Sequence, residues 1–497
     1  MEIKERIIVD QIDVRSSTPA NAMTFIDCDF KKRLVISQMS GFKEIRFEGC
    51  VFEAEVFFEY LQTEISFENC RFKEVLTFNG AEQDLTLAAF RFDKKLRIRG
   101  PYHGCLKLVG INNEIPQGDE EMGGLSFHRG TCEKFELKDC RLSWIVFEGL
   151  WDFKRNVHID NCVATSVIMT NVYIGNWLMV SRSEIKKFII NTLTSDHRYI
   201  EFSASCSIQS LSIALHEVDR LVISDCLVHN LRLWGTNGKT GVLEVKKSTF
   251  MVLKFDEVFN EGRAAFRGVV CKLGGQIAIL SSTLGKCNFI DCDFSAATME
   301  FENSNVTELF LSETDFPEFV TSDGIINYTQ ARMAFGQLHT AFEKQGDTVR
   351  ALEYQSREIE AHYYSLPFFW NDLPPIIHVT KLNLWLNKWS NNFGRNWMRG
   401  VVFSFAIGLA CFYGLVISSK EYHIGWGLAI NWQLVSSYFR FMNPLRFFEL
   451  EALFRQNNGQ SYLTLTPASY VIDFFGRIGI AYGFYQTIQA FRRFGRK

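Results

Sequence analysis

The stretch IRFEGCVFEAEVFFEYLQTEISFENCRF, residues 45–72, decides the fold. Its first and last eight residues share one pattern: apolar, any, apolar, two polar or small residues, cysteine, any, apolar. Cys50 and Cys70 hold the same place in these two copies and are 20 residues apart. A unit repeated at so short a period is typical of a solenoid, in which each repeat stacks on its neighbours.

The pattern recurs through residues 20–320 with a period of 20 to 22 residues. Clear copies end at Phe52, Phe72, Leu142, Val228 and Phe294, and weaker copies end at Phe92, Phe250 and Phe316. Nine of the 13 cysteines are assigned to the central slot, namely Cys28, Cys50, Cys70, Cys140, Cys162, Cys206, Cys226, Cys271 and Cys292. Ser248 and Thr314 replace cysteine there. We interpret the slot as a core ladder, because a thiol packs like a small hydrophobic group.

Metal binding or redox chemistry is the alternative role for this cysteine ladder. No histidine shares the period of the cysteines, and the sequence contains no CxxC pair. Sites for structural metals usually show one or both of these features. The sequence therefore favours core packing, and we expect neither a metal nor a cofactor.

Each repeat contains a second stretch of alternating apolar residues, such as EVFFE after Phe52 and VLTFN after Phe72. This alternation indicates a strand with one buried face. The sequence therefore predicts a mainly β solenoid, a parallel β-helix over residues 20–320, whose coils each rise by about 4.8 Å. A leucine-rich repeat is the alternative, but it would need a helix or 3₁₀ turn in place of the second strand.

The periodicity changes from 2 to 3.6 in residues 325–366, which predicts an α-helical hairpin. Ala331, Phe335 and Leu338 follow helical spacing, and Gly346-Asp347 marks the turn. The hairpin resembles a single tetratricopeptide-like unit. We expect it to cap the open end of the β-helix, where unpaired strand edges would otherwise aggregate.

A C-terminal membrane domain is expected over residues 376–497, with spans near residues 401–418 and 468–491. The first span is uncharged and has the length of a membrane-crossing helix. Cations gather before it and in the terminal RRFGRK, so the positive-inside rule places the solenoid and both termini in the cytoplasm. Trp385, Trp389 and Trp397 have the character of interfacial anchors.

Two features of the spans are candidate functional positions. Asp473 and Arg477 lie one helical turn apart, and they either form a functional charge pair or extend to the interface. Small residues recur at every fourth position, a spacing that lets membrane helices approach closely. These helix-packing candidates are Ala406, Ala410, Gly414, Gly479 and Gly483. They serve either the hairpin or a homo-oligomer.

Composition excludes other classes of function. Residues 373–497 hold 13 basic and 4 acidic residues, whereas the rest of the chain holds 40 basic and 52 acidic ones. An acidic body of this kind argues against nucleic-acid binding. The N-terminus lacks a signal peptide, and the sequence shows no HExxH or repeated Asp pair. We therefore expect a non-enzymatic protein, and a carbohydrate-active β-helix enzyme is an unfavoured alternative.

From Thr24 to Lys497 the chain resembles bacterial membrane-anchored proteins with pentapeptide-repeat-like β-helices, whose solenoid leads through A…L…G-D…A…Y…E helices to a membrane hairpin. The ending YQTIQAFRRFGRK fits that resemblance, whereas the repeats diverge from strict pentapeptides. The resemblance implies a multi-pass protein of the bacterial inner membrane that contacts lipid. We expect an interaction scaffold or sensor with a protein partner on its solenoid. An ion-conducting pore gated by the solenoid is the alternative, although no TVGYG-like filter is present.

Overall fold

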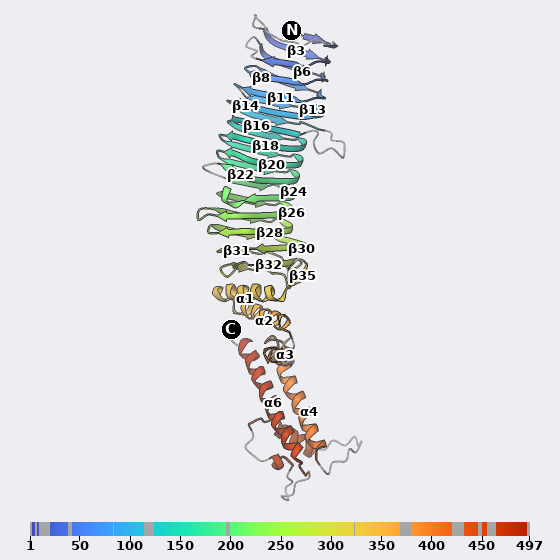
Figure 1. Cartoon of the computed structure of the whole chain (residues 1–497), viewed down its shortest axis with the longest axis vertical. Helices are drawn as coiled ribbons and strands as arrows, with labels where there is room; N and C mark the ends of the chain where they lie inside the picture. The colour runs from blue at the N-terminus through green and yellow to red at the C-terminus, as the bar shows by residue number, and fades with distance from the viewer. Residues whose placement is uncertain are drawn as a thin grey trace, which may run out of the picture. The chain divides into compact units, whose positions relative to one another are not determined.

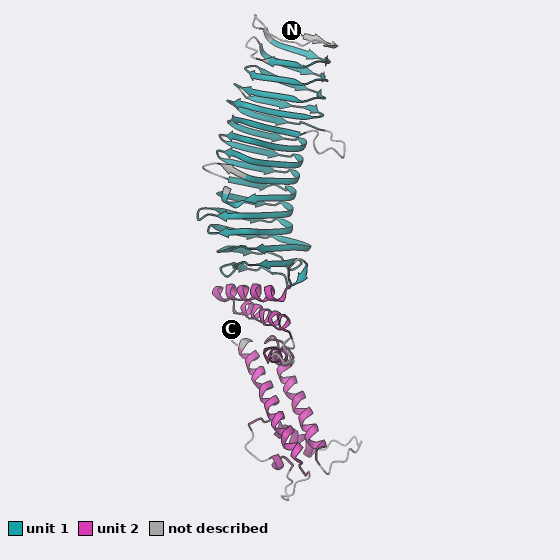
Figure 2. Ribbon diagram, viewed as in Figure 1, with its two compact units in different colours: residues 1–326 teal, residues 327–497 magenta. Residues whose placement is uncertain are grey.

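The computed structural model describes residues 2–4, 7–8, 20–37, 42–82, 84–113, 124–194, 199–322, 324–367, 379–419, 432–445, 450–454 and 464–494. The chain divides into two compact units, residues 1–326 and residues 327–497 (Figure 2). The first unit is built from strands and the second from helices.

The first unit is a parallel β-solenoid, in which strands of successive coils lie one above another (Figure 1). One face begins with β1 (Glu2–Lys4), β3 (Ala20–Ile26), β6 (Phe42–Glu48) and β9 (Glu64–Glu68). The later coils continue with β12 (Leu85–Ala88), β15 (Cys105–Val109), β17 (Lys134–Lys138), β19 (Asn156–Asp160), β21 (Trp177–Ser181), β23 (Tyr199–Ser203), β25 (Arg220–Ser224), β27 (Val242–Lys246), β29 (Arg263–Arg267), β31 (Cys287–Ile290) and β33 (Phe310–Ser312).

A second sheet forms from the other strand of each coil. Its described members are β5 (Leu34–Ser37), β8 (Val56–Leu61), β11 (Leu76–Ala81), β14 (Lys95–Tyr102), β16 (Gly124–Cys132), β18 (Arg141–Phe153), β20 (Val163–Ile174), β22 (Glu184–Thr194), β24 (Ser207–Ala214), β26 (Leu227–Asn237), β28 (Thr249–Asn260), β30 (Val270–Leu280), β32 (Thr298–Glu302), β34 (Val320–Ser322) and β35 (Ile325–Ile326). Short strands turn the corner in the early coils: β2 (Ile7–Ile8), β4 (Asp29–Phe30), β7 (Val51–Phe52), β10 (Cys70–Phe72) and β13 (Phe90–Phe92).

This second strand decides between the two solenoids that the sequence allows. Among the described strands every pairing is parallel except that of β34 with β35. A 3₁₀ helix, η1 (Leu215–Glu217), is a local addition after β24. The β-helix prediction is therefore confirmed, and the leucine-rich alternative is wrong because a strand stands where that fold needs a helical segment.

The core of the solenoid consists of aromatic ladders that run from coil to coil. Phe52 is fully buried and stacks on Phe30 at 4.7 Å and on Phe72 at 4.4 Å between ring centroids. Phe25 and Phe47 stack in a second ladder, with 4.9 Å between their ring centroids. In-register parallel pairing places equivalent side chains directly over one another, so one repeated phenylalanine makes a continuous stack.

The second unit contains α1 (Tyr328–Gln345), α2 (Thr348–Ser365), α3 (Val379–Asn391), α4 (Trp397–Ile417), α5 (Trp432–Phe441), η2 (Leu450–Phe454) and α6 (Pro467–Phe494). Helices α1 and α2 form the expected hairpin. Gly346 ends α1 in the left-handed conformation at φ 77°, and Asp347 caps α2 by accepting a hydrogen bond from the Arg350 N–H at 3.1 Å. Phe342 and Tyr354 stack between the helices at 5.2 Å.

Candidate functional site

The central slot of the repeat is a hydrogen-bonding position at the corner of the coils that carry cysteine, serine or threonine there. Cys162 Sγ donates to Asp160 O at 3.2 Å in its own coil and to Leu137 O at 3.5 Å in the preceding coil. Ser248 makes the same local contact through Oγ to Lys246 O at 2.7 Å. A small side chain with a donor satisfies these carbonyls, which explains why serine and threonine can replace cysteine there. Phe90, the register partner of Cys70, fills the slot of one coil with a buried aromatic ring instead.

Most of the assigned cysteines occupy this slot, but Cys271 lies elsewhere in the core. Its register partner on the neighbouring strand is Phe250, so it belongs to the phenylalanine ladder, two residues beyond the slot. Ser183 fills the slot in the coil after Cys162 and donates to Ser181 O at 2.7 Å. Sequence reasoning missed Ser183, although LMVSRSEI at residues 178–185 fits the pattern with serine in the slot, as at Ser248.

Burial makes two thiols outside the slot, those of Cys271 and Cys287, poor nucleophiles. Burial raises the pKa of Cys271 to about 11, and it also raises the pKa of Cys287. Thiols with raised pKa values stay protonated near neutral pH and are inert. None of the 13 cysteines, all within the described ranges, forms a disulfide. The described residues also hold no group of three His, Cys, Asp or Glu side chains placed to bind a metal.

The residue before the slot has a conformational role that the sequence pattern concealed. Asn69, Asp139, Asn161 and Asp225 all have φ between 52° and 55°, in the left-handed region. Asparagine and aspartate tolerate this region better than other non-glycine residues. The two polar residues before each cysteine therefore mark a tight turn between the strands.

A basic cluster lies on the outer face of β14, formed by Lys95, Arg97 and Arg99. These three alternate with the buried Leu96 and Ile98, so their side chains leave the same face of the sheet. Neighbouring coils hold ion pairs such as Arg71 with Asp93. Within the described part of the chain, none of these ion pairs involves Lys95, Arg97 or Arg99.

Neighbouring strands add polar groups to the basic cluster. Thr77 is the register partner of Arg97 and is only 3% exposed. Thr77 Oγ1 and Arg97 Nε both lack a hydrogen-bond partner within the described part of the chain. His128 Nδ1 lies 3.0 Å from Glu148 Oε2. Burial lowers the pKa of His128, and the charge of Glu148 opposes this shift. The positive charges of Arg99, Lys95 and Arg97 lower that pKa further. The three cations of the cluster therefore outnumber the one described carboxylate beside them, that of Glu148.

Helices α4 and α6 pack along each other in antiparallel directions (Figure 1). A Cβ atom added to Gly483 would meet Ser404 Oγ at 2.2 Å, and one added to Gly479 would meet Ile407 Cγ2 at 2.7 Å. Both glycines thus lie where the two helices approach most closely. A Cβ atom added to Gly414 would lie 3.8 Å from Ile472 Cδ1 of α6, an ordinary contact distance.

The remaining small-residue candidates face away from this contact. Ala406 and Ala410 are exposed, whereas Ser404, Gly408 and Phe412 form the buried face of α4. The helix-packing candidates therefore form two separate groups, one inside the α4–α6 contact and one on the outer face of α4. The glycines of α6 serve the helix pair, and the alanines of α4 lie on the outside.

Asp473 and Arg477 are brought together as the spacing predicts. Arg477 Nε donates to Asp473 Oδ2 at 3.0 Å, one turn along α6. The Asp473 side chain is 8% exposed and that of Arg477 is 35% exposed. The pair thus extends from the helix interior towards the surface, which fits charge neutralisation within the helix pair.

Among the described helices, α4 alone is long and apolar enough to cross a membrane. The second expected span forms α6, which is longer but carries Asp473, Arg477 and Gln486 and does not meet this criterion. Both helices nevertheless expose large apolar side chains along their length, each 43–63% exposed: Val402, Phe405, Leu409, Tyr413 and Ile417 on α4, and Val471, Phe474, Phe475, Ile478, Ile488 and Phe491 on α6. We call this surface the apolar band. On α4 it extends for about 23 Å.

Helix α3 holds its lysines inside and its tryptophans outside. Lys381 Nζ lies 3.8 Å from the Tyr363 ring centroid and donates to Tyr363 O, and Lys388 Nζ donates to Tyr364 Oη at 2.7 Å. Burial lowers the pKa of Lys381, and the adjacent Lys388 adds to that shift. These contacts fix α3 to α2, while Trp389 on the outer side is 63% exposed.

Helix α3 also contacts α6, so it joins the α1–α2 hairpin to the end of α6. The buried Asn391 Nδ2 donates to Gln486 Oε1 at 2.5 Å. Arg395, just after α3, pairs with Glu360 of α2 at 3.1 Å. These links frame the space between the hairpin and the last turns of α6.

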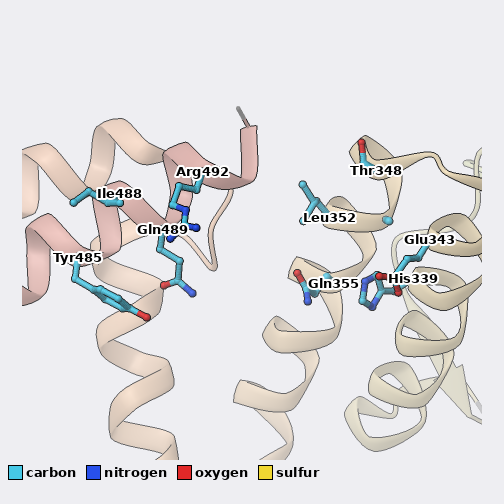
Figure 3. Close-up of a pocket in the computed structure, with 10 residues that line it drawn as sticks. His339, Glu343, Thr348, Leu352, Gln355, Tyr485, Ile488, Gln489 and Arg492 are labelled. Carbon is cyan, nitrogen blue, oxygen red and sulfur yellow. The ribbon is translucent and has the colours of Figure 1, made fainter. Parts of the chain in front are cut away.

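A pocket of about 480 Å³ occupies that space (Figure 3). Figure 3 shows Gln489 and Arg492 on the α6 side and His339, Glu343 and Gln355 on the hairpin side. Its lining consists of His339, Glu343, Thr348, Ala351, Leu352, Gln355, Tyr485, Ile488, Gln489 and Arg492. Sequence reasoning missed this pocket, because its two walls are more than a hundred residues apart and neither carries a motif.

No protein-family model, curated protein or solved structure matches this chain.

Proposed function

We propose that this protein is a non-enzymatic membrane-anchored scaffold of the bacterial inner membrane. The α4–α6 pair inserts as a hairpin, and the solenoid presents a docking surface in the cytoplasm. The apolar band carries this proposal, because soluble proteins rarely expose contiguous apolar surface of this extent. Its length along α4, about 23 Å, approaches the thickness of the hydrocarbon core, which is about 30 Å.

The direction of insertion follows from charge. Lys381, Lys388 and Arg395 precede α4, and Arg399 lies in its first turn. Residues 492–497 add four more cations at the C-terminal end of the chain. Excess Lys and Arg favour the cytoplasmic side, so the start of α4, the end of α6 and the solenoid are assigned to the cytoplasm. The resemblance to membrane-anchored pentapeptide-repeat-like proteins supports the same orientation.

Protease accessibility tests this anchor and its orientation. In spheroplasts expressing the full chain, the solenoid should resist external protease and become sensitive only after lysis. The protein should also remain in the membrane after alkaline carbonate washing. Release by carbonate would contradict the anchor. Cleavage from outside would reverse the orientation and favour an exported β-helix, and conductance in planar bilayers would favour the pore.

The docking surface is assigned to the basic cluster of Lys95, Arg97 and Arg99, and its partner to an acidic protein segment. Three cations on one strand, about 6.7 Å apart, present a linear positive array. Such an array complements carboxylates spaced along an extended or helical partner.

Charge reversal tests this surface. The double variant Arg97→Glu/Arg99→Glu should lose a partner that wild type retains in membrane pull-downs, and binding should weaken with salt. Arg263→Glu/Arg267→Glu is the matched control, because these arginines are exposed on β29 of the other sheet. The retained protein should carry an acidic segment that cross-links to the β14 face. Equal recovery by the β14 variant and wild type would overturn the assignment.

A further inference from the structure

The pocket beside α6 combines an apolar wall with opposite charges. Ile488 and Tyr485 are 58% and 61% exposed and belong to the same helix as the apolar band. One turn further, Arg492 supplies a cation, and Glu343 supplies a carboxylate from the hairpin (Figure 3). Within the described ranges neither charge takes part in an ion pair with another residue.

The position of the pocket along α6 corresponds to the membrane interface. Trp397 packs edge-on against Phe491, with ring centroids 6.1 Å apart at 89°. Tryptophan concentrates at the level of lipid headgroups, and Arg492 follows Phe491 directly. The polar end of the pocket therefore lies where headgroups would surround an inserted hairpin, and its apolar end lies towards the acyl chains.

The charges select among headgroups. Arg492 suits a phosphate, since a guanidinium donates two parallel hydrogen bonds to one. Glu343 suits an ammonium group that carries N–H donors. A choline headgroup has no such donors and is usually held by several Trp, Tyr or Phe rings, whereas Tyr485 is the single residue of these three types among those lining this pocket. An anionic headgroup without an amine would leave Glu343 facing a phosphate.

We propose that this pocket binds a zwitterionic phospholipid with a primary ammonium group, phosphatidylethanolamine by chemistry. Its phosphate contacts Arg492, its ammonium contacts Glu343, and its acyl chains lie along Tyr485 and Ile488. The volume of about 480 Å³ falls within the range of small-molecule sites. This proposal rests on the membrane anchor proposed above.

Lipid titration of the full chain in detergent tests the proposal. Native mass spectrometry should detect phosphatidylethanolamine bound at least fivefold more tightly than phosphatidylglycerol or phosphatidylcholine. Arg492→Gln should weaken phosphatidylethanolamine binding about tenfold, as expected when a charge-assisted hydrogen bond is lost. Glu343→Gln should abolish the preference over phosphatidylglycerol. Arg399→Gln, an exposed arginine outside the pocket at the start of α4, should change neither.

The remaining outcomes distinguish the sources of phosphate. Glycerophosphoethanolamine or inorganic phosphate binding as tightly as the lipid would identify a soluble ligand and overturn the lipid. Equal binding by wild type and Arg492→Gln would show that the lipid does not bind in this pocket. Carbonate extraction of the same variants reports the anchor separately, so a protein that stays in the membrane without lipid selectivity refutes this inference alone.

Discussion

Replacing Phe52 by alanine is expected to destabilise the solenoid by about 3–5 kcal/mol, the usual cost of truncating a buried phenylalanine. Phe52 is fully buried and stacks on both of its ladder neighbours, Phe30 and Phe72. Its backbone is fixed by parallel pairing on both sides, so the coil has little freedom to collapse into the cavity. Urea unfolding of the full chain in mild detergent, followed by the β-sheet circular dichroism signal, measures the loss.

Phe57→Ala is the matched control, since it removes the same atoms from the outer face of the adjacent strand β8. Phe57 is partly exposed and contacts Arg33, whose guanidinium carbon lies 4.2 Å from the ring centroid. The expected cost is about 1 kcal/mol, the scale of one cation–π contact. Hydrogen exchange should localise the effect of Phe52→Ala to β4, β7 and β10. Equal losses for the two variants would contradict a core made of stacked ladders.

The solenoid was predictable because its information is local and repeated. The spacing of Cys50 and Cys70 marks one coil, and the alternation after Phe52 marks its second strand. Position-specific roles were less visible. Asn161 and Asp225 look like ordinary polar residues, but both adopt a left-handed backbone conformation. Cys271 has nearly the expected spacing, yet an altered coil places it beside Phe250.

The pocket was not predictable, because no local pattern joins its two walls. Glu343 and Arg492 belong to separate helices whose approach depends on α3. That approach depends on Asn391 with Gln486 and on Arg395 with Glu360, which are ordinary polar residues in the sequence. Asp473 and Arg477 show the opposite case: one helical turn separates them, and their spacing alone brings them together.

Replacing Gly483 by leucine is expected to break the contact between α4 and α6, at a cost of about 1–3 kcal/mol from overpacking. Even a Cβ atom there would meet Ser404 Oγ at 2.2 Å and Ser404 Cα at 3.2 Å. The Ser404 hydroxyl also donates to Gly400 O at 2.8 Å, which limits its movement. Leucine has a higher helix propensity than glycine by about 1 kcal/mol, so any net loss of stability must come from the packing between α4 and α6. Thermal unfolding of the full chain in detergent measures it.

Ala406→Leu is the matched control on the opposite stripe, because Ala406 is exposed on α4. Its side chain would face lipid in the proposed membrane orientation, and the helix pair should keep its stability. If the Ala406 and Ala410 stripe joins two copies of the chain, Ala406→Leu should instead shift the oligomer towards monomer in light scattering, with the hairpin intact. Gly483→Leu should loosen the hairpin in either state, since its contacts lie within one chain. An unchanged unfolding temperature for Gly483→Leu would therefore contradict the predicted contact between Gly483 and α4. The prediction about the Ala406 and Ala410 stripe would still stand.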